Sequence, residues 1–396
     1  MYRPAIVAVG YDRPEALKRL LTSIESAVYA EDVRPVLVIS IDKSGNDDVV
    51  NVARKFEYSH GDKVVIERPE RMGLREHVLT CGDLTEEYGS IIVLEDDIFV
   101  APCFYEYACN ALDISDEDDR IGAISLYNHL FNVHKRDSFC AIDDGYDNYY
   151  LQLASSWGQA YTKKQWSGFR KWYEANKERD LKDPFVPANV SGWSDRSWLK
   201  YYIVYLIETG RYCLYPRVSF TTNFGDVGSH AVKPETDLQV PICGSRRHPY
   251  CNFSLTGSSR AVYDSFFEPV GITEDEKVCL GALDRINDDN ALLVDLYDTK
   301  PVKEMIASKR YRYVLSSKSL PYRVVRSFAR QMRPVDANIV YDIGGNDFHL
   351  YDVSKKADMP AKERDAHRYL YEYRGISAAR MIEIIKVRVL EKLGRN

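Results

Sequence analysis

The chain has 396 residues, of which 45% are hydrophobic and 28% are charged, and its formal net charge is −6. These proportions are ordinary for a globular protein, and the length allows two domains. No stretch approaches roughly 18 consecutive apolar residues, which excludes a transmembrane helix, and the eight cysteines lack the CxxC spacing of a zinc site. The first residues enter a strand at once, without a leader sequence, so we expect a cytosolic protein with reduced thiols.

Short apolar runs alternate with amphipathic segments through the first hundred residues. Apolar runs rich in β-branched residues predict strands, and apolar residues at helical spacing predict helices between them. Because such alternation is typical of parallel sheets covered by helices, we expect an α/β fold with a Rossmann-like, mostly parallel sheet and flanking helices. The predicted strands are 5–10, 35–41, 63–67 and 91–94, and the predicted helices begin at Pro14, Asp48 and Arg75.

Three consecutive acids, Glu95, Asp96 and Asp97, follow the predicted buried strand 91–94. Adjacent carboxylates repel one another and resist desolvation, so they persist most easily beside a cation. Hard divalent cations prefer such oxygen ligands, and open α/β sheets bind ligands at the carboxyl ends of their strands. We therefore favour a site for Mn²⁺ or Mg²⁺; the alternative is a solvated acidic turn.

The segment 93–107, VLEDDIFVAPCFYEY, resembles the metal-binding segment of inverting GT-A glycosyltransferases. It is most similar to the N-acetylglucosaminyltransferases that build N-glycans and O-mannose glycans, and to related bacterial polysaccharide transferases. The resemblance spans about residues 3–232. It implies a GT-A fold, a nucleotide-diphosphate sugar donor that is UDP-linked, and a glycan or lipid-linked acceptor. It also implies that Asp97 binds the metal, while Glu95 and Asp96 contact ribose or metal-bound water.

Residues near three other strand ends match nucleotide contacts of the family. Arg13 follows the first strand, and Asp42 follows the second and matches the acid that reads the uracil ring. Arg75 and His77 occupy the region where relatives present a basic group to the nucleotide. From the residues alone, Arg13 could lie at a helix cap, Asp42 could form an Asx-turn, and His77 could be an ordinary core or surface histidine.

Two later segments resemble the parts of the family that contact the donor sugar and phosphates. Trp157 and Gly158 match the segment that lines the donor-sugar pocket, although a core tryptophan beside a glycine bend is an equal alternative. Ser229 and His230 lie in the loop 221–231, which resembles a loop that folds over the donor phosphates. Glycines, a hydroxyl and a histidine suit phosphate contact, but His230 could equally be a hinge or cap.

Asp195 is the expected general base. Inverting transfer is one in-line displacement, so a single carboxylate within reach of the acceptor hydroxyl is sufficient. Relatives place this base in a Trp-Asp-Asp-Trp-like element that opens a helix, and 193–198 matches it with Ser194 in place of the first acid. The alternative is a helix-start acid that is stabilised by the helix dipole.

The last third, 269–396, lies outside the resemblance, and we expect it to be an α-rich extension. Its segment 300–334 contains ten lysines and arginines and one acid, in a chain of net charge −6. Apolar residues from Tyr322 onward predict a basic amphipathic helix that binds an anionic membrane surface, or that packs on the acidic first domain. No nucleic-acid motif accompanies this charge. A further amphipathic helix is predicted over 377–393.

Residues 1–268 are therefore interpreted as a GT-A catalytic domain, with a nucleotide-binding half, 1–100, and an acceptor-side half, 101–268. The expected function is metal-dependent, inverting transfer of a hexose or N-acetylhexosamine in surface polysaccharide synthesis, in the cytoplasm or peripherally on the inner face of the membrane. One alternative is a nucleotidyltransferase, but the first turn, GYDRPEA, lacks that class's glycine-rich loop. Another is a non-catalytic carbohydrate-binding scaffold, which the intact acids disfavour. Donor sugar, acceptor and oligomeric state are not legible in the sequence.

Overall fold

The computed structural model divides into two compact units, each with its own sheet. The first unit comprises 1–271 with 299–301, and the second comprises 272–298 with 302–396. The structure describes residues 1–226, 238–246, 251–270, 292–357 and 376–392.

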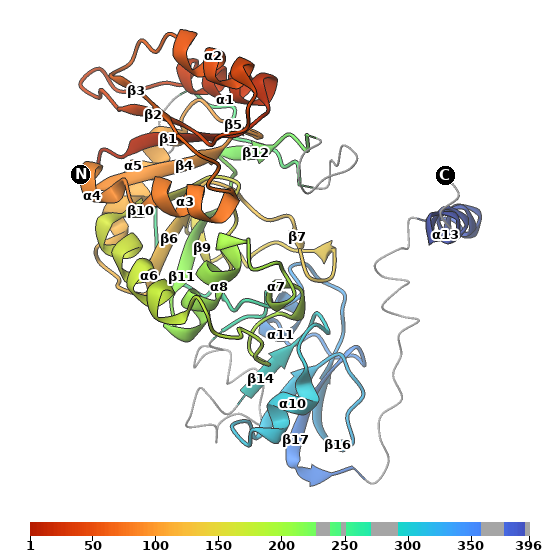
Figure 1. The fold of residues 1–396 in the computed structure, drawn as a ribbon. Helices are drawn as coiled ribbons and strands as arrows, with labels where there is room; N and C mark the ends of the chain where they lie inside the picture. The colour runs from red at the N-terminus through yellow and green to blue at the C-terminus, as the bar shows by residue number, and fades with distance from the viewer. Residues whose placement is uncertain (227–237, 247–250, 271–291, 358–375, 393–396) are drawn as a thin grey trace. The chain divides into compact units, whose positions relative to one another are not determined.

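A mixed sheet of nine strands forms the centre of the first unit (Figure 1). Strands β4, β1, β2 and β3 run parallel, while β10 is antiparallel to both of its neighbours. The expected α/β fold with a mostly parallel sheet is confirmed. In sheet order the strands are β13 (Val262–Tyr263), β9 (Asn148–Leu151), β11 (Tyr212–Pro216), β6 (Ile121–Ser125), β10 (Gln159–Thr162), β4 (Ser90–Glu95), β1 (Ala5–Gly10), β2 (Leu37–Ile41) and β3 (Lys63–Glu67).

The register of the central strands brings their carboxyl ends to one edge. Every residue of β1 and β2 is buried, as expected for strands covered on both faces. Val9 pairs with Glu95, and Gly10 pairs with Ile41. The residues that follow β1 and β2, and the acids at the end of β4, therefore emerge beside one another.

Helices cover both faces of the sheet (Figure 1). Alternating residues of β10 show the two faces. Ala160 belongs to the core beneath α1 and α5, whereas Tyr161 points to the other face, where it contacts Trp166 and Tyr202. The helices are α1 (Pro14–Glu25), α2 (Asp47–Lys55), α3 (Leu74–Gly82), α4 (Thr85–Tyr88), α5 (Phe104–Ser115), α6 (Lys163–Asn176), α7 (Ala188–Ser191) and α8 (Trp198–Glu208).

Two short strands outside the main sheet join the acidic segment to a distant part of the chain. β5 (Ile98–Val100) pairs antiparallel with β12 (Thr221–Asn223), so the predicted loop 221–231 begins as a strand. The backbone N–H of Phe224 then donates to the carbonyl oxygen of Asp97 at 2.9 Å. A second small hairpin is formed by β7 (Phe131–Asn132) and β8 (Asp137–Ser138).

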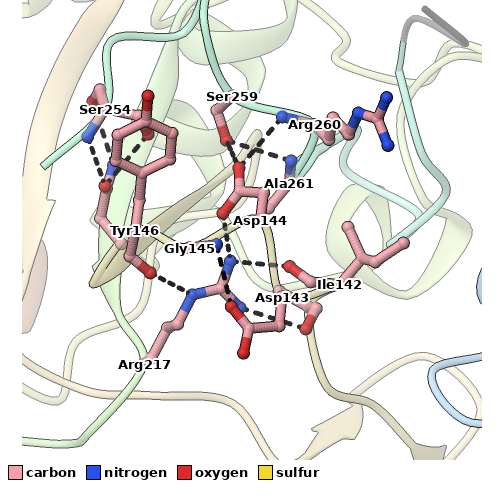
Figure 2. A network of polar contacts seen from close by, with 12 residues as sticks. Ile142, Asp143, Asp144, Gly145, Tyr146, Arg217, Ser254, Ser259, Arg260 and Ala261 are labelled. Atoms are coloured by element: carbon pink, nitrogen blue, oxygen red, sulfur yellow. Dashed lines mark hydrogen bonds and ion pairs between the residues drawn. The ribbon is translucent and has the colours of Figure 1, made fainter. Parts of the chain in front are cut away.

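A polar network around Arg217 joins loops in the later part of the first unit (Figure 2). The guanidinium donates to the carbonyl oxygens of Tyr146 at 2.6 Å and Ile142 at 2.7 Å, and to the carboxylate of Asp144 at 2.7 Å. The other oxygen of Asp144 accepts from Ser259 Oγ at 2.7 Å. These hydrogen bonds therefore join three separate segments of the chain.

The second unit contains a sheet, which corrects the expectation of an α-rich extension. Its four strands stand in the order β14, β15, β17, β16. The predicted basic helix from Tyr322 is wrong, because these residues form a strand that pairs antiparallel with β17. The elements are β14 (Leu292–Asp295), α10 (Val302–Ala307), β15 (Tyr313–Ser316), β16 (Tyr322–Phe328), α11 (Ala337–Val340), β17 (Phe348–Lys356) and α13 (Ala378–Lys392).

Several cations of the basic segment 300–334 are already paired within the protein. Lys318 contacts the carboxylates of Asp295 at 3.1 Å and Asp298 at 3.2 Å, and Arg326 pairs with Asp342. Without a helix, and with these charges neutralised, the argument for an interfacial basic helix is lost. No helix in the described part of the chain is both long and apolar enough to cross a bilayer. The predicted final helix is confirmed as α13.

Gly82 tests the packing of α3 against α6. A Cβ atom on Gly82 would lie 1.9 Å from Cζ2 of Trp166, whose Nε1 donates to Asp83 at 2.8 Å and is thereby restrained. We expect Gly82→Ala to lower the free energy of unfolding by about 2 kcal/mol or more, because overpacking forces neighbours off their rotamers. Urea denaturation measures this change. Gly244→Ala is the control, since no atom lies within 4 Å of its Cβ position, and equal stabilities for the two variants would contradict the packing argument.

Candidate functional site

The three acids lie at the carboxyl edge of the sheet, facing Arg13. Asp96 is buried, and both its oxygens are contacted by the Arg13 guanidinium, one of them by Nε at 3.3 Å. Arg13 Nη2 also lies 3.4 Å from the carboxylate of Asp97, whose side chain is 20% exposed. Arg13 stands at the N-terminus of α1 and makes no side-chain cap hydrogen bond. The structure therefore brings three of the predicted residues, Arg13, Asp96 and Asp97, into direct contact.

Burial disfavours the ionised forms of these neighbouring carboxylates. Burial, together with the charges of Asp97 and Asp96, raises the pKa of Glu95 to about 8. Burial also raises the pKa of Asp96 to about 6, although the charge and hydrogen bonds of Arg13 oppose that shift. A single guanidinium thus compensates the acids incompletely, and additional positive charge at this edge would favour their ionised forms.

Asp42 lies at the same edge, after β2, and is buried. Its carboxylate accepts hydrogen bonds from the backbone N–H groups of Lys43 at 2.9 Å, Met72 at 2.8 Å and Gly73 at 2.9 Å. The contact with Lys43 is the local turn expected of an aspartate, while the contacts with Met72 and Gly73 fix a second segment thirty residues away. Asp42 therefore organises the turn that leads into α3, in addition to standing at the strand end.

His77 is a buried residue of α3 rather than a surface group. Its Nε2 lies 2.8 Å from Ser40 Oγ, on the face of β2 covered by α3. Burial lowers the pKa of His77 to about 4; the nearby charge of Asp42 opposes this shift, and that of Arg68 adds to it. The imidazole is consequently neutral at pH 7, and it packs against the end of β2 through its contact with Ser40.

Sequence reasoning missed Arg68. It is the first residue after β3, and its Nη2 donates to Ser40 Oγ at 3.3 Å. Its buried Nε has no hydrogen-bond partner among the residues that the structure describes. The strand-end argument that selected Arg13 and Asp42 applies equally to Arg68, so the signal was present in the sequence.

Trp157 and Gly158 lie where β10 begins, beside the end of β4. Trp157 stacks obliquely on Tyr127, with ring centroids 4.6 Å apart. Gly158 has φ +98°, and a Cβ atom there would lie 2.9 Å from Thr221 Cγ2, so both the conformation and the space require glycine. The side chain of the neighbouring Ser156 acts to lower the pKa of Glu95, against the rise caused by burial, so this segment lies beside the acids.

Asp195 is exposed in the segment that precedes α8, and two cations hold it. Its carboxylate accepts from Lys200 Nζ at 2.9 Å, and its carbonyl oxygen accepts from Arg75 Nη1 at 2.7 Å. The hydrogen bond and charge of Lys200 lower the pKa of Asp195. Arg75 thus contacts the predicted base, a relation that the sequence did not reveal.

Ser229 and His230 lie outside the described residues. The described start of their loop is held against α1, where the Arg19 guanidinium stands 3.8 Å from the ring centroid of Phe224 and pairs with Asp226.

The residues at the acidic edge fit a divalent cation in part. Three adjacent carboxylates face one guanidinium, and the side chain of Asp97, at 20% exposed, is more accessible than that of Asp96, at 6%. Among the described residues, no group of three His, Cys, Asp or Glu side chains could hold a metal ion alone. Mg²⁺ is usually bound by one or two carboxylates that share it with substrate phosphates and water. Asp97 could hold an ion in that manner, with a diphosphate as co-ligand.

Comparison with known proteins supports the glycosyltransferase resemblance. No family model matches the chain. The alpha-1,3-mannosyl-glycoprotein 2-beta-N-acetylglucosaminyltransferase of Arabidopsis thaliana is 26% identical over 242 residues, which make up 57% of the chain and 48% of the relative. The chain is a distant homologue of this glycosyltransferase. The expected resemblance to GT-A glycosyltransferases is confirmed. The chain spans only about half the length of this relative.

Two solved structures align with part of the chain. The mannosyltransferase PcManGT from Pyrobaculum calidifontis, solved with GDP-Man and Mn²⁺, has a TM-score of 0.35 and 13% identity, covering 55% of each chain. Staphylococcus aureus TarS has a TM-score of 0.32 and 10% identity, covering 55% of this chain and 36% of TarS.

The buried His77 makes the stability of the folded protein depend on pH. Its pKa is about 4 in the folded protein, below the usual value of about 6.5 for an exposed histidine, so protonation favours unfolding. The contribution is fully present above pH 6.5 and is lost as the pH falls toward 4, amounting to about 3 kcal/mol. Urea unfolding at pH 7, 5.5 and 4 measures the free energy of unfolding, which should fall less with pH in His77→Gln than in the wild type. Equal decreases in the two proteins would contradict this role of His77.

Proposed function

We propose that residues 1–268 form the catalytic domain of a metal-dependent, inverting glycosyltransferase that uses a UDP-linked sugar. The observation that carries this proposal is the meeting of Arg13, Asp96 and Asp97 at the edge where β4, β1 and β2 end. Ligands of open α/β sheets bind at such edges. The homology to an N-acetylglucosaminyltransferase supports the reaction class, and an N-acetylhexosamine or another hexose is the proposed donor sugar. A glycan or lipid-linked acceptor of a surface polysaccharide is the proposed substrate.

Donor binding is proposed to use the strand-end residues. Asp97 would hold Mn²⁺ or Mg²⁺ together with the diphosphate, and the ion would neutralise charge that develops on the leaving group. Arg13, which already contacts Asp96 and Asp97, stands close enough to share in binding the diphosphate. Asp42 lies after β2 and would contact the uracil ring of the nucleotide. Arg68 adds a positively charged side chain at the same edge of the sheet.

Acceptor activation is assigned to Asp195. The base must take one proton from the acceptor hydroxyl as that oxygen attacks the anomeric carbon. The Asp195 carboxylate is 81% exposed, so an acceptor can reach it, and Lys200 lowers its pKa, so it is ionised at neutral pH. Trp157 and Gly158 are the proposed lining of the donor-sugar site, since they stand where β10 begins, beside the end of β4 that carries the acids. Ser229 and His230 remain proposed phosphate contacts.

Asp97→Asn tests the metal site. We expect UDP affinity in the presence of Mn²⁺ to fall at least about tenfold, because the variant removes the anionic oxygen that would share the ion with the diphosphate. Isothermal titration with UDP, with and without Mn²⁺, measures the change. Asp48→Asn, an exposed aspartate on α2, is the matched control. If the UDP affinity of the wild type does not change when Mn²⁺ is added, the result would instead favour the interpretation as a non-catalytic scaffold.

Asp195→Asn tests the base. A panel of nucleotide sugars, scored for hydrolysis, first identifies the donor that the wild type consumes. Turnover of that donor should fall by a factor of about 10² to 10⁴ in the variant, because general-base catalysis is lost. UDP affinity should stay unchanged, since Asp195 is placed on the acceptor side. Glu178→Gln provides an exposed control, and undiminished turnover in Asp195→Asn would assign the base to another residue.

A further inference from the structure

The Asp195 segment has little packing of its own to orient it. The carboxylate is 81% exposed, and its neighbours Ser194 and Arg196 are also exposed. Local backbone hydrogen bonds run from Trp193 N–H to Val190 at 3.1 Å and from Ser197 N–H to Ser194 at 3.0 Å. A base must be held close to its productive geometry, and this requires support from neighbouring residues. That support comes from two cations.

Lys200 and Arg75 hold different atoms of this segment. Lys200 is buried, and its ammonium donates to the Asp195 carboxylate at 2.9 Å and to the Trp193 carbonyl oxygen at 3.0 Å. Arg75 donates to the Asp195 carbonyl oxygen at 2.7 Å, and its guanidinium lies 5.8 Å from the ring centroid of Tyr201. Lys200 fixes the side chain from α8, and Arg75 fixes the main chain from α3.

Arg75 follows directly on a turn that is held by Asp42, the residue proposed to contact the nucleotide. Met72 and Gly73 donate their backbone N–H groups to the buried Asp42 carboxylate at 2.8 Å and 2.9 Å. Gly73 adopts φ +81°, and α3 begins at the next residue. One rigid turn therefore connects Asp42 to Arg75, and Arg75 connects this turn to Asp195.

We propose that Arg75 is a positioning residue that holds the main chain of Asp195 against the turn fixed by Asp42, rather than a nucleotide contact. The proposal rests on the proposed function for the role of Asp195. It links the two substrate sites, because a nucleotide that contacts Asp42 stabilises the turn from which Arg75 holds the base. Donor binding and orientation of the base are thereby coupled.

Hydrogen–deuterium exchange on the full chain tests this link. In Arg75→Met, amides of 193–197 should exchange about tenfold faster than in the wild type, because a charge-assisted hydrogen bond that restrains the segment is lost. UDP with Mn²⁺ should slow exchange at 193–197 in the wild type and not in the variant. Arg71→Met is the matched control: it lies in the same segment, and its guanidinium stands 5.3 Å from the ring centroid of Tyr11.

UDP affinity separates the two roles of Arg75. A positioning residue predicts that Arg75→Met binds UDP and Mn²⁺ within about twofold of the wild type, while turnover of the donor falls and its KM is retained. Unchanged exchange at 193–197 in Arg75→Met overturns the proposal, and so does a loss of UDP affinity of about tenfold or more. Arg75→Lys serves in the same assays where Arg75→Met does not fold. A wild type that binds no UDP refutes the proposed function separately, since the exchange of 193–197 in the absence of nucleotide still reports on the Arg75 contact.

Discussion

The contact between Arg13 and the acids at the end of β4 is the interaction on which the candidate site depends. A buried Asp96 beside two other carboxylates is unfavourable unless a cation compensates it, and Arg13 supplies that charge. It can do so only because β1 lies next to β4 in parallel register, with α1 starting immediately after the strand. Sheet order, strand register and helix start therefore all serve one electrostatic requirement.

The loops of the first unit that follow residue 100 are held together in a different way. There, single cations join separate loops by bonding to backbone carbonyl oxygens. Arg217 does this for the segment 141–147 (Figure 2), and Arg75 and Lys200 do it for the segment before α8. Such contacts leave the carboxylate of Asp195 open to solvent while its backbone is held.

The second unit shows how a local pattern misleads. Basic residues alternate with apolar ones from Tyr322 to Phe328, and a run of this length fits a helix face or a strand. Burial alternates from Tyr322 to Val325, the register shifts between Val324 and Arg326, and Phe328 is buried, as in a strand with one covered face. Pairing with β17, about twenty residues later, decided the outcome. That partner is distant in the sequence, so local periodicity could not identify it.

The sequence by itself determined the α/β fold, the strands of the first half, and the strand-end positions of Arg13, Asp42 and the three acids. These follow from hydrophobic periodicity and from the rule that parallel strands end at a common edge. Only the tertiary structure decided that His77 lies beneath the sheet edge, bonded to Ser40, and that Arg75 reaches Asp195. Both outcomes depend on which face of α3 meets the sheet and which meets α8, and that is set by packing between segments far apart in the chain.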